Sequence, residues 1–248
     1  MEKINILEEE DEIKEINKIF KTLMHFPGST FSDLWDKTIP SNKFTYNLKK
    51  MENEKLIEKK NGKYYLTIAG KSFATTVDGA TGTTKKRPLV GLLLIVKKDD
   101  KYILYHRQKE PYYGNCGFPG AKVEYGEEIL VAAKRELFEE TGLVCDGEII
   151  AIQNAVITND NDLFGHITQY FVLFENPTGD LIEESREGKY EWATKEKIVS
   201  QKNLFPDIPG AIEIVENNTF VVRETKIIQK NEKFKDIEFN VLIETKRK

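Results

Sequence analysis

The chain has 248 residues, of which 40% are hydrophobic and 31% charged, and its formal net charge is −4. This apolar share is enough for a packed core, so the composition excludes a wholly disordered chain. The longest apolar run is shorter than the roughly 20 residues of a membrane span, and the N-terminus lacks a signal-peptide pattern. Because two cysteines are too few for a disulfide framework, we expect a cytoplasmic protein in which each cysteine is a small buried apolar residue.

The clearest break in composition lies in residues 77–88, where glycine, threonine and basic residues replace any apolar periodicity. A segment of this kind is typical of a linker. We therefore predict a first domain over residues 1–78, a linker over residues 79–88 and a second domain over residues 89–248. Residues 41–88 carry 11 basic and 4 acidic side chains. Such a local excess of positive charge is typical of proteins that bind phosphate backbones, although ordinary surfaces show it too.

Three helices are predicted in the first domain. Residues 13–23 place apolar side chains at helical spacing behind an acidic start, and Pro27 ends this helix. A short second helix is expected over residues 31–35, and a third begins after Pro40. The third helix has one apolar face, made of Phe44, Leu48 and Met51.

A β-hairpin is predicted after the third helix, because Asn61-Gly62 stands between two strand-like runs and both positions favour positive φ. Three helices followed by a lysine-rich hairpin resemble a winged helix-turn-helix domain over residues 8–77. This resemblance implies a third helix in the major groove of duplex DNA and a wing on the phosphates. The alternative is a dimerisation or protein-docking module. The expected DNA-binding residues are Ser41, Asn42, Lys43, Thr45, Tyr46, Lys49, Lys60 and Lys63.

The second domain contains an acidic helix with a candidate metal site. Residues 127–141 are rich in helix-forming residues and follow a Pro-Gly loop, with Gly142 placed to stop the helix. Glu136, Glu139 and Glu140 are spaced so that their carboxylates lie on one side of it. Like charges so spaced destabilise an isolated helix by about 0.2–0.5 kcal/mol per pair, and a divalent cation would reverse that interaction. Carboxylate oxygens favour Mg²⁺ or Mn²⁺; the alternative is a solvated acidic helix face.

These residues resemble the signature of the Nudix hydrolases, which reads Gly, five residues, Glu, seven residues, Arg-Glu-apolar-any-Glu-Glu-any-Gly-apolar. Glu127 fills the first glutamate position, and residues 135–143 complete the pattern. The only departure is Ala121, where the signature has glycine. The resemblance implies an α/β (α+β) fold in which helices sandwich a mixed sheet. It also implies Mg²⁺- or Mn²⁺-dependent hydrolysis of a nucleoside diphosphate linked to another moiety.

The same resemblance assigns roles to individual residues. The implied magnesium ligands are the carbonyl of Gly120 and the carboxylates of Glu136, Glu139 and Glu140. Two roles stay open for Glu136, which would either ligate a second metal or act as the base toward the attacking water. Glu127 would pair with Arg135 and orient the helix without touching the substrate. If the signature glycine has a positive φ, Ala121 costs on the order of 1 kcal/mol and shifts the neighbouring carbonyl.

Two positions outside the signature complete the predicted site. Residues 102–107 look like the second strand of the family, where a basic residue such as Arg107 approaches phosphate. The alternative for Arg107 is a surface arginine at the end of a strand. An acidic segment precedes the strand around Trp192, and its Glu187 is our candidate for a further base or metal ligand.

Strands are also predicted at both ends of the second domain. The apolar run over residues 89–96 indicates a buried strand. Residues 219–223 and 237–243 indicate two long strands around a polar turn. An exposed hairpin of this length favours pairing with another chain, and a homodimer would suit a winged helix that reads two half-sites.

The two domains together allow two functions. The first is a nucleotide pyrophosphohydrolase that its winged helix targets or regulates. The second is a transcription regulator whose Nudix domain senses a nucleotide such as ADP-ribose, with weak or no hydrolysis. A sensor does not need a complete set of metal-binding carboxylates, so residues 135–143 favour hydrolysis.

Overall fold

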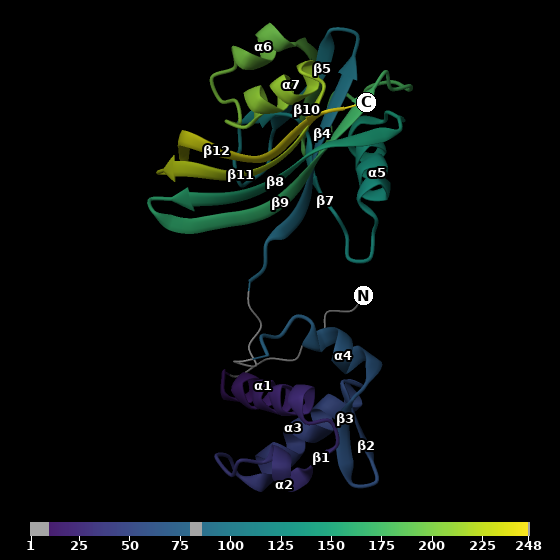
Figure 1. Cartoon of the computed structure of the whole chain (residues 1–248), viewed down its shortest axis with the longest axis vertical. Coiled ribbons are helices and arrows are strands. Elements are labelled where there is room, and N and C mark those ends of the chain that lie inside the picture. The colour runs from purple at the N-terminus through teal and green to yellow at the C-terminus, as the bar shows by residue number, and fades with distance from the viewer. Residues whose placement is uncertain (1–9, 80–85, 248) are drawn as a thin grey trace. The chain divides into compact units, whose positions relative to one another are not determined.

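The computed structural model describes residues 10–79 and 86–247, with side chains from residue 15 onward. The chain divides into two compact units, Met1–Lys86 and Arg87–Lys248, and each is described by itself (Figure 1). Most of the predicted linker lies outside the described residues, as does the start of the predicted winged-helix segment. None of the helices in the described segments combines the length and hydropathy that a membrane crossing needs.

The first unit contains four helices and a small sheet among its described residues. Its elements are α1 (Glu10–His25), β1 (Ser29–Thr30), α2 (Phe31–Leu34), α3 (Ser41–Asn53), β2 (Ile57–Lys60), β3 (Lys63–Leu66) and α4 (Ile68–Ala74). Thr30 caps α2 in a capping box with Asp33, which fixes where this short helix begins. The strands lie in the order β1-β3-β2. The predicted hairpin is confirmed, and its turn residues Asn61 and Gly62 both have positive φ.

The core of the first unit forms between α1 and α3. The predicted apolar face of α3 is confirmed, because Phe44, Leu48 and Met51 are all buried. Asn47 is buried on the same helix, and neither polar atom of its side chain has a hydrogen-bond partner. The sequence pattern did not indicate this, since an asparagine between apolar positions reads as part of a polar face.

The second unit is a mixed sheet with helices on both faces, as predicted (Figure 1). Its strands are β4 (Leu89–Lys98), β5 (Lys101–Arg107), β6 (Cys116–Gly117), β7 (Gly120–Lys122), β8 (Gly147–Asn159), β9 (Asp162–Glu175), β10 (Gly188–Thr194), β11 (Thr219–Lys230) and β12 (Lys233–Lys246). Its helices are α5 (Ile129–Thr141), α6 (Lys195–Val199) and α7 (Ile208–Glu216). The main strand order is β10-β5-β4-β9-β8-β11-β12, with β6 beside β5 and β7 beside β4. The pairs β4–β9 and β8–β11 are parallel.

Strand β4 runs through the middle of this unit and has apolar side chains on both faces. Leu92 and Leu94 pack in the cluster with α5, whereas Leu93 packs in the cluster with α7. A strand buried on both faces produces the continuous apolar run seen in the sequence. The buried part is shorter than predicted, because Leu89 and Val90 are 54% and 43% exposed and lie outside both clusters.

The last two strands form a long antiparallel hairpin at one edge of the sheet. β11 is parallel to β8 and buries alternate side chains, such as Val221, against α7 and its neighbours. β12 is the edge strand, and Val241, Leu242 and Ile243 are exposed on it. The predicted pair of strands is therefore confirmed.

Candidate active site

The side chain of Arg135, on α5, is the centre of an ion-pair cluster. Its Nε and Nη2 atoms donate to the two carboxylate oxygens of Glu127, each at 2.8 Å. Its Nη1 atom donates to Glu136 at 2.9 Å and to Glu139 at 3.1 Å. The hydrogen bond from the guanidinium lowers the pKa of the Glu127 carboxyl. The bidentate contact ties the loop before α5 to the helix, because the fork geometry of arginine matches a carboxylate.

Glu140 is the carboxylate of this helix with the most perturbed environment. Burial raises its pKa to about 7, and the negative charges of Glu136 and Glu187 add to this effect. The positive charge of Lys109 and a hydrogen bond from Tyr190 act in the opposite direction. The charge of Glu140 is therefore influenced both by α5 itself and by the segment before β10.

Two tyrosines from neighbouring strands support this group. Tyr105 and Tyr190 lie opposite each other in β5 and β10, and their rings stack with centroids 5.1 Å apart. The Tyr105 hydroxyl donates to the backbone carbonyl of Glu187 at 2.9 Å. The Tyr190 hydroxyl approaches a carboxylate oxygen of Glu140 at 3.5 Å. The two hydroxyls thus reach Glu187 and Glu140, the two carboxylate residues that come from different segments.

Sequence reasoning missed Lys109, Tyr105 and Tyr190. Lys109 forms an ion pair with Glu187. One signal was available for Tyr105, since it stands two residues before Arg107 on the same strand and side chains two apart share a face. Nothing local indicated Tyr190, because its position depends on the pairing of β5 with β10.

Arg107 is held by the loop that follows it. Its Nε atom donates to the carbonyl of Pro111 at 2.6 Å, and its Nη2 atom donates to the carbonyl of Glu110 at 3.3 Å. Its charge also lowers the pKa of Tyr105, although burial of that ring has the larger and opposite effect. Arg107 is thus beside the tyrosine pair, with its guanidinium already engaged by backbone carbonyls.

Gly120 and Ala121 lie in the short strand β7. They pair with Leu93 and Leu92 of β4, respectively. The φ angle of Ala121 is not positive, so the strain that an alanine would add in a left-handed conformation does not arise in this structure. The departure from the signature glycine therefore leaves β7 in an ordinary extended conformation.

The donors near Glu140 match a magnesium ion in chemistry. Carboxylate oxygens are the hard ligands that Mg²⁺ takes. A cation would also offset the negative charges of Glu136 and Glu187, which add to the effect of burial on the pKa of Glu140. Across residues 10–79 and 86–247, however, no three His, Cys, Asp or Glu side chains are close enough together to form a ready-made metal site. Arg135 accounts for part of this, because Glu136 and Glu139 both pair with it.

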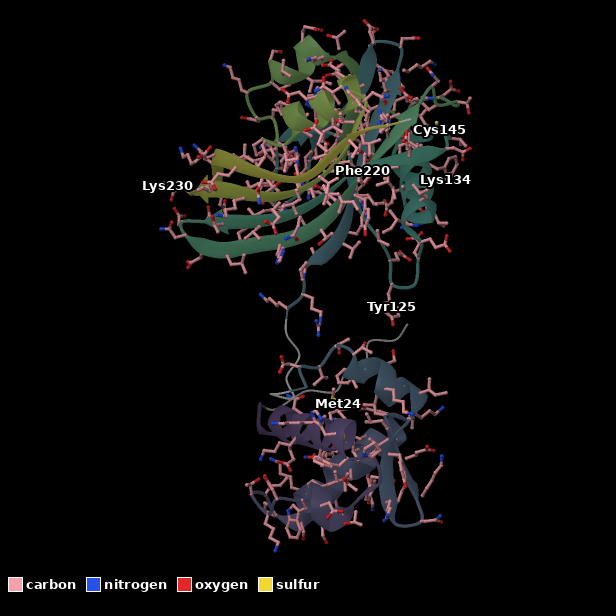
Figure 2. The ribbon with its side chains drawn as sticks, viewed as in Figure 1. Met24, Tyr125, Lys134, Cys145, Phe220 and Lys230 are labelled. Carbon is pink, nitrogen blue, oxygen red and sulfur yellow. The ribbon has the colours of Figure 1, made fainter. Side chains whose placement is uncertain are left out.

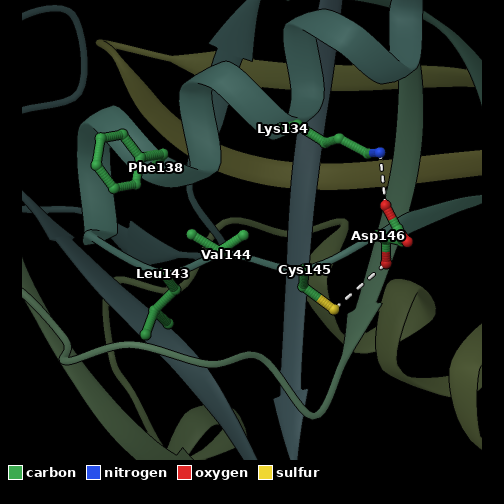
Figure 3. Close-up of a pocket in the computed structure, with 6 residues that line it drawn as sticks. All are labelled: Lys134, Phe138, Leu143, Val144, Cys145 and Asp146. Atoms are coloured by element: carbon green, nitrogen blue, oxygen red, sulfur yellow. Dashed lines mark hydrogen bonds and ion pairs between the residues drawn. The ribbon is translucent and has the colours of Figure 1, made fainter.

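A hollow of about 310 Å³ lies elsewhere on the second unit, and it contains none of the predicted site residues (Figure 3). Its lining residues are Lys134, Phe138, Leu143, Val144, Cys145 and Asp146. Lys134 and Asp146 form an ion pair of 2.5 Å across it. Tyr125, which Figure 2 labels, lies in the loop between β7 and α5, and its side chain is exposed.

The predicted DNA-binding residues are spread over α3 and the hairpin of the first unit. Exposed side chains are those of Ser41, Asn42, Tyr46, Lys49, Lys60 and Lys63. Lys43 and Thr45 are half-buried, and the Thr45 hydroxyl donates to the carbonyl of Ser41 at 2.7 Å. Lys60 pairs with Glu58 at 2.6 Å. The structure thus leaves most of the predicted set on the surface of the unit.

Comparison with known proteins identifies the second unit. The NUDIX domain family matches residues 85–216, which is more than half of the chain, so the chain belongs to the Nudix family and is a Nudix hydrolase. An ADP-ribose pyrophosphatase from Methanocaldococcus jannaschii is 29% identical over 126 residues, which cover 49% of this chain and 73% of that protein. Nudix hydrolase 10 from Arabidopsis thaliana is 33% identical over 118 residues, covering 43% of this chain and 42% of that protein.

A solved structure supports the fold. A MutT protein from Bacillus halodurans superimposes with a TM-score of 0.52 at 22% identity, covering 61% of this chain and 97% of that one. The family match ends at residue 216, so the hairpin of β11 and β12 lies outside it. The first unit lies outside it as well, except for its last residues.

Proposed function

We propose that the chain hydrolyses the pyrophosphate bond of a nucleoside diphosphate linked to another moiety, in a reaction that depends on Mg²⁺ or Mn²⁺. The observation that carries this proposal is the group of carboxylates on α5, Glu136, Glu139 and Glu140, of which Glu140 has a pKa raised first by burial and then by the charges of Glu136 and Glu187. Like charges held together without a cation are unfavourable, and such perturbed groups are common at functional sites. The relative from M. jannaschii, an ADP-ribose pyrophosphatase, makes ADP-ribose the first substrate to test.

The proposed roles follow the signature. The metal would be held by the Gly120 carbonyl and by Glu136, Glu139 and Glu140. When bound, it would neutralise phosphate charge and lower the pKa of a water molecule. Glu136 and Glu139 would exchange their hydrogen bonds with Arg135 for this role, whereas Glu127 would keep the helix in place through its bidentate contact.

The general base and the phosphate contacts are assigned by proximity. The charges of Glu136 and Glu187 both raise the pKa of Glu140, and this supports either carboxylate as the base that would accept a proton from the attacking water. Arg107 lies beside Tyr105, and a substrate phosphate would compete with the loop carbonyls for its guanidinium.

The test is release of a nucleoside monophosphate by the full chain with Mg²⁺, using ADP-ribose first and then a nucleotide panel. Glu140→Gln is expected to lower kcat/KM by at least about 100-fold, because it removes a charge that would face the metal. Glu196→Gln, at an exposed glutamate of α6, is the matched control and should leave turnover unchanged. No turnover of any nucleotide, with tight binding of ADP-ribose, would instead favour the nucleotide-sensing regulator.

For the first unit we propose binding of duplex DNA through α3 and the β2–β3 hairpin. The order α1, β1, α2, α3, β2, β3 agrees with the winged-helix resemblance, and the polar side of α3 is exposed. Lys49→Glu should weaken binding and reduce its salt dependence. Lys21→Glu, an equal charge change at an exposed position of α1, is the control. If the two variants change DNA binding equally, the proposal is contradicted and the alternative of a protein-docking module is favoured.

We further propose a homodimer that uses the β12 edge. This edge is unpaired among the described residues and has exposed apolar side chains, which are Phe239, Val241, Leu242 and Ile243. Sedimentation at several protein concentrations tests the proposal. A monomer at all concentrations, or a dimer that persists in Leu242→Lys, contradicts it.

A further inference from the structure

The loop between β5 and β6 is closed tightly on itself. The backbone amide of Arg107 donates to the carbonyl of Asn115, and the amide of Gly114 donates to the carbonyl of Arg107, both at 2.9 Å. The Arg107 side chain binds the carbonyls of Glu110 and Pro111 inside the loop. These hydrogen bonds join residues 108–115 to the end of β5.

Tyr112 attaches this loop to four residues in other parts of the unit. The centroid of its ring lies 5.4 Å from that of Phe234 of β12, and the two rings make an angle of 27°. The ring centroid of Phe205, before α7, is 5.6 Å away. Tyr112 also contacts Phe164 of β9, at 5.9 Å. The side-chain amide of Gln229, on β11, donates to the Tyr112 hydroxyl at 3.1 Å. Two of these four partners belong to the β11–β12 hairpin, outside the Nudix family match.

The backbone of Tyr112 has a φ of 73°, in the left-handed region that favours glycine. For a bulky side chain this conformation is strained, and it persists only where the surroundings impose it. The ring contacts and the hydrogen bond from Gln229 are such surroundings. Removing the ring thus removes the contacts that hold the backbone of Tyr112, and with it the loop, in this conformation.

The other end of the loop contacts the candidate active site. Lys109 pairs with the Glu187 carboxylate, and the backbone amide of Gln108 donates to the Glu187 carbonyl at 2.9 Å. The charge of Lys109 also acts on Glu140. Lys109 is a flexible point charge, and its position depends on the backbone that carries it.

We propose that Tyr112 is a positioning residue, through which the β11–β12 hairpin holds Lys109 beside Glu187 and Glu140 so that its ammonium group contacts the diphosphate of the substrate. The inference rests on the proposed hydrolysis at that site. Lys109 is paired with the carboxylate of Glu187, whereas the guanidinium of Arg107 is bonded to carbonyls of the loop, so the two cations are separate candidates for contacts with phosphate. A diphosphate brought to these carboxylates would replace Glu187 as the partner of Lys109.

The experiment compares Tyr112→Ala, Tyr112→Phe and Tyr113→Ala in the full chain. Tyr113 is adjacent but 65% exposed, so it is a matched control. We expect Tyr112→Ala to raise KM and the dissociation constant of ADP-ribose about tenfold with kcat changed much less, because a charge-assisted contact to the ground state is lost. Tyr112→Phe keeps the ring contacts and should stay within about threefold of wild type. Tyr113→Ala should match wild type.

A double-mutant cycle separates positioning from a general loss of structure. If Tyr112 acts through Lys109, adding Tyr112→Ala to Lys109→Ala should cause little further loss. Additive effects of the two changes would overturn the proposal, as would an unchanged KM in Tyr112→Ala. Amide hydrogen exchange at Gly114 should accelerate in Tyr112→Ala and not in Tyr113→Ala, whether or not the enzyme turns over.

The same measurements distinguish the two proposals. A wild-type chain that binds ADP-ribose but hydrolyses no nucleotide contradicts the proposed function, and the positioning role is then decided by the dissociation constants alone. A wild-type chain that turns over, with Tyr112→Ala unchanged in KM and in exchange at Gly114, contradicts the positioning role alone.

Discussion

Glu140 links the proposed function to the stability of the protein. Its pKa of about 7 reflects first burial and then the charges of Glu136 and Glu187. A side chain in this environment destabilises the metal-free protein at neutral pH, since the ionised form is disfavoured in the folded state. Residues selected for catalysis commonly carry such a cost.

Metal-free protein should therefore lose stability as pH rises. In the folded state Glu140 keeps its proton up to about pH 7, whereas the unfolded chain releases it near 4.5. Stability from this group is fully present below about pH 4.5 and is lost as pH rises through 7, by up to about 3 kcal/mol.

The measurement is the thermal midpoint in EDTA between pH 4.5 and pH 8, for wild type and for Glu140→Gln. The thermal midpoint of the variant should rise relative to that of wild type as pH rises, because glutamine has no proton to lose. Curves that stay parallel across this range would exclude Glu140 as the titrating group. Adding Mn²⁺ at pH 8 should stabilise wild type more than the variant.

The helix α5 illustrates what a local sequence pattern determines. The shared side of its carboxylates was readable from spacing, because a period of 3.6 residues assigns each side chain to a face. Its end was readable from the glycine that follows it. Its end is fixed by Gly142, in the left-handed conformation with a φ of 73°. A Cβ atom there would lie 2.9 Å from the carbonyl oxygen of Asp180.

Gly142→Ala should consequently destabilise the second unit by about 2–3 kcal/mol, since left-handed strain and a backbone clash add. Gly126→Ala is the matched control. It has a φ of 88° but open space around its added Cβ, so only about 1 kcal/mol is expected. Unfolding midpoints in urea give both values. Equal losses of unfolding free energy in the two variants would mean that the backbone at Asp180 moves away from the new Cβ atom at no energetic cost.

At the scale of the whole molecule, the two units have separate cores. The cluster of the first unit includes Phe20 and Phe44, and the clusters of the second lie on the two faces of its sheet. The sequence indicated a division near residue 85 from composition alone. A unit with its own core is able to fold alone.

Residues 87–248 expressed alone should thus hydrolyse the same nucleotides as the full chain, with kcat/KM within about threefold. Residues 1–86 expressed alone should be folded by circular dichroism and should keep any DNA binding.

Shortening the second piece to end at residue 216, where the family match ends, should abolish folding, because β11 supplies Val221 to the core. A folded, active piece ending there would show that the hairpin is dispensable.

The sequence by itself determined the Nudix signature, the acidic face of α5 and the Asn61-Gly62 hairpin, since each depends on neighbours a few residues apart. Only the tertiary structure decided that Lys109 meets Glu187, 78 positions away, and that Tyr190 meets Glu140, 50 positions away. Strand order and register bring such pairs together. They depend on long-range pairing across the whole sheet, which no local period of apolar and polar residues specifies.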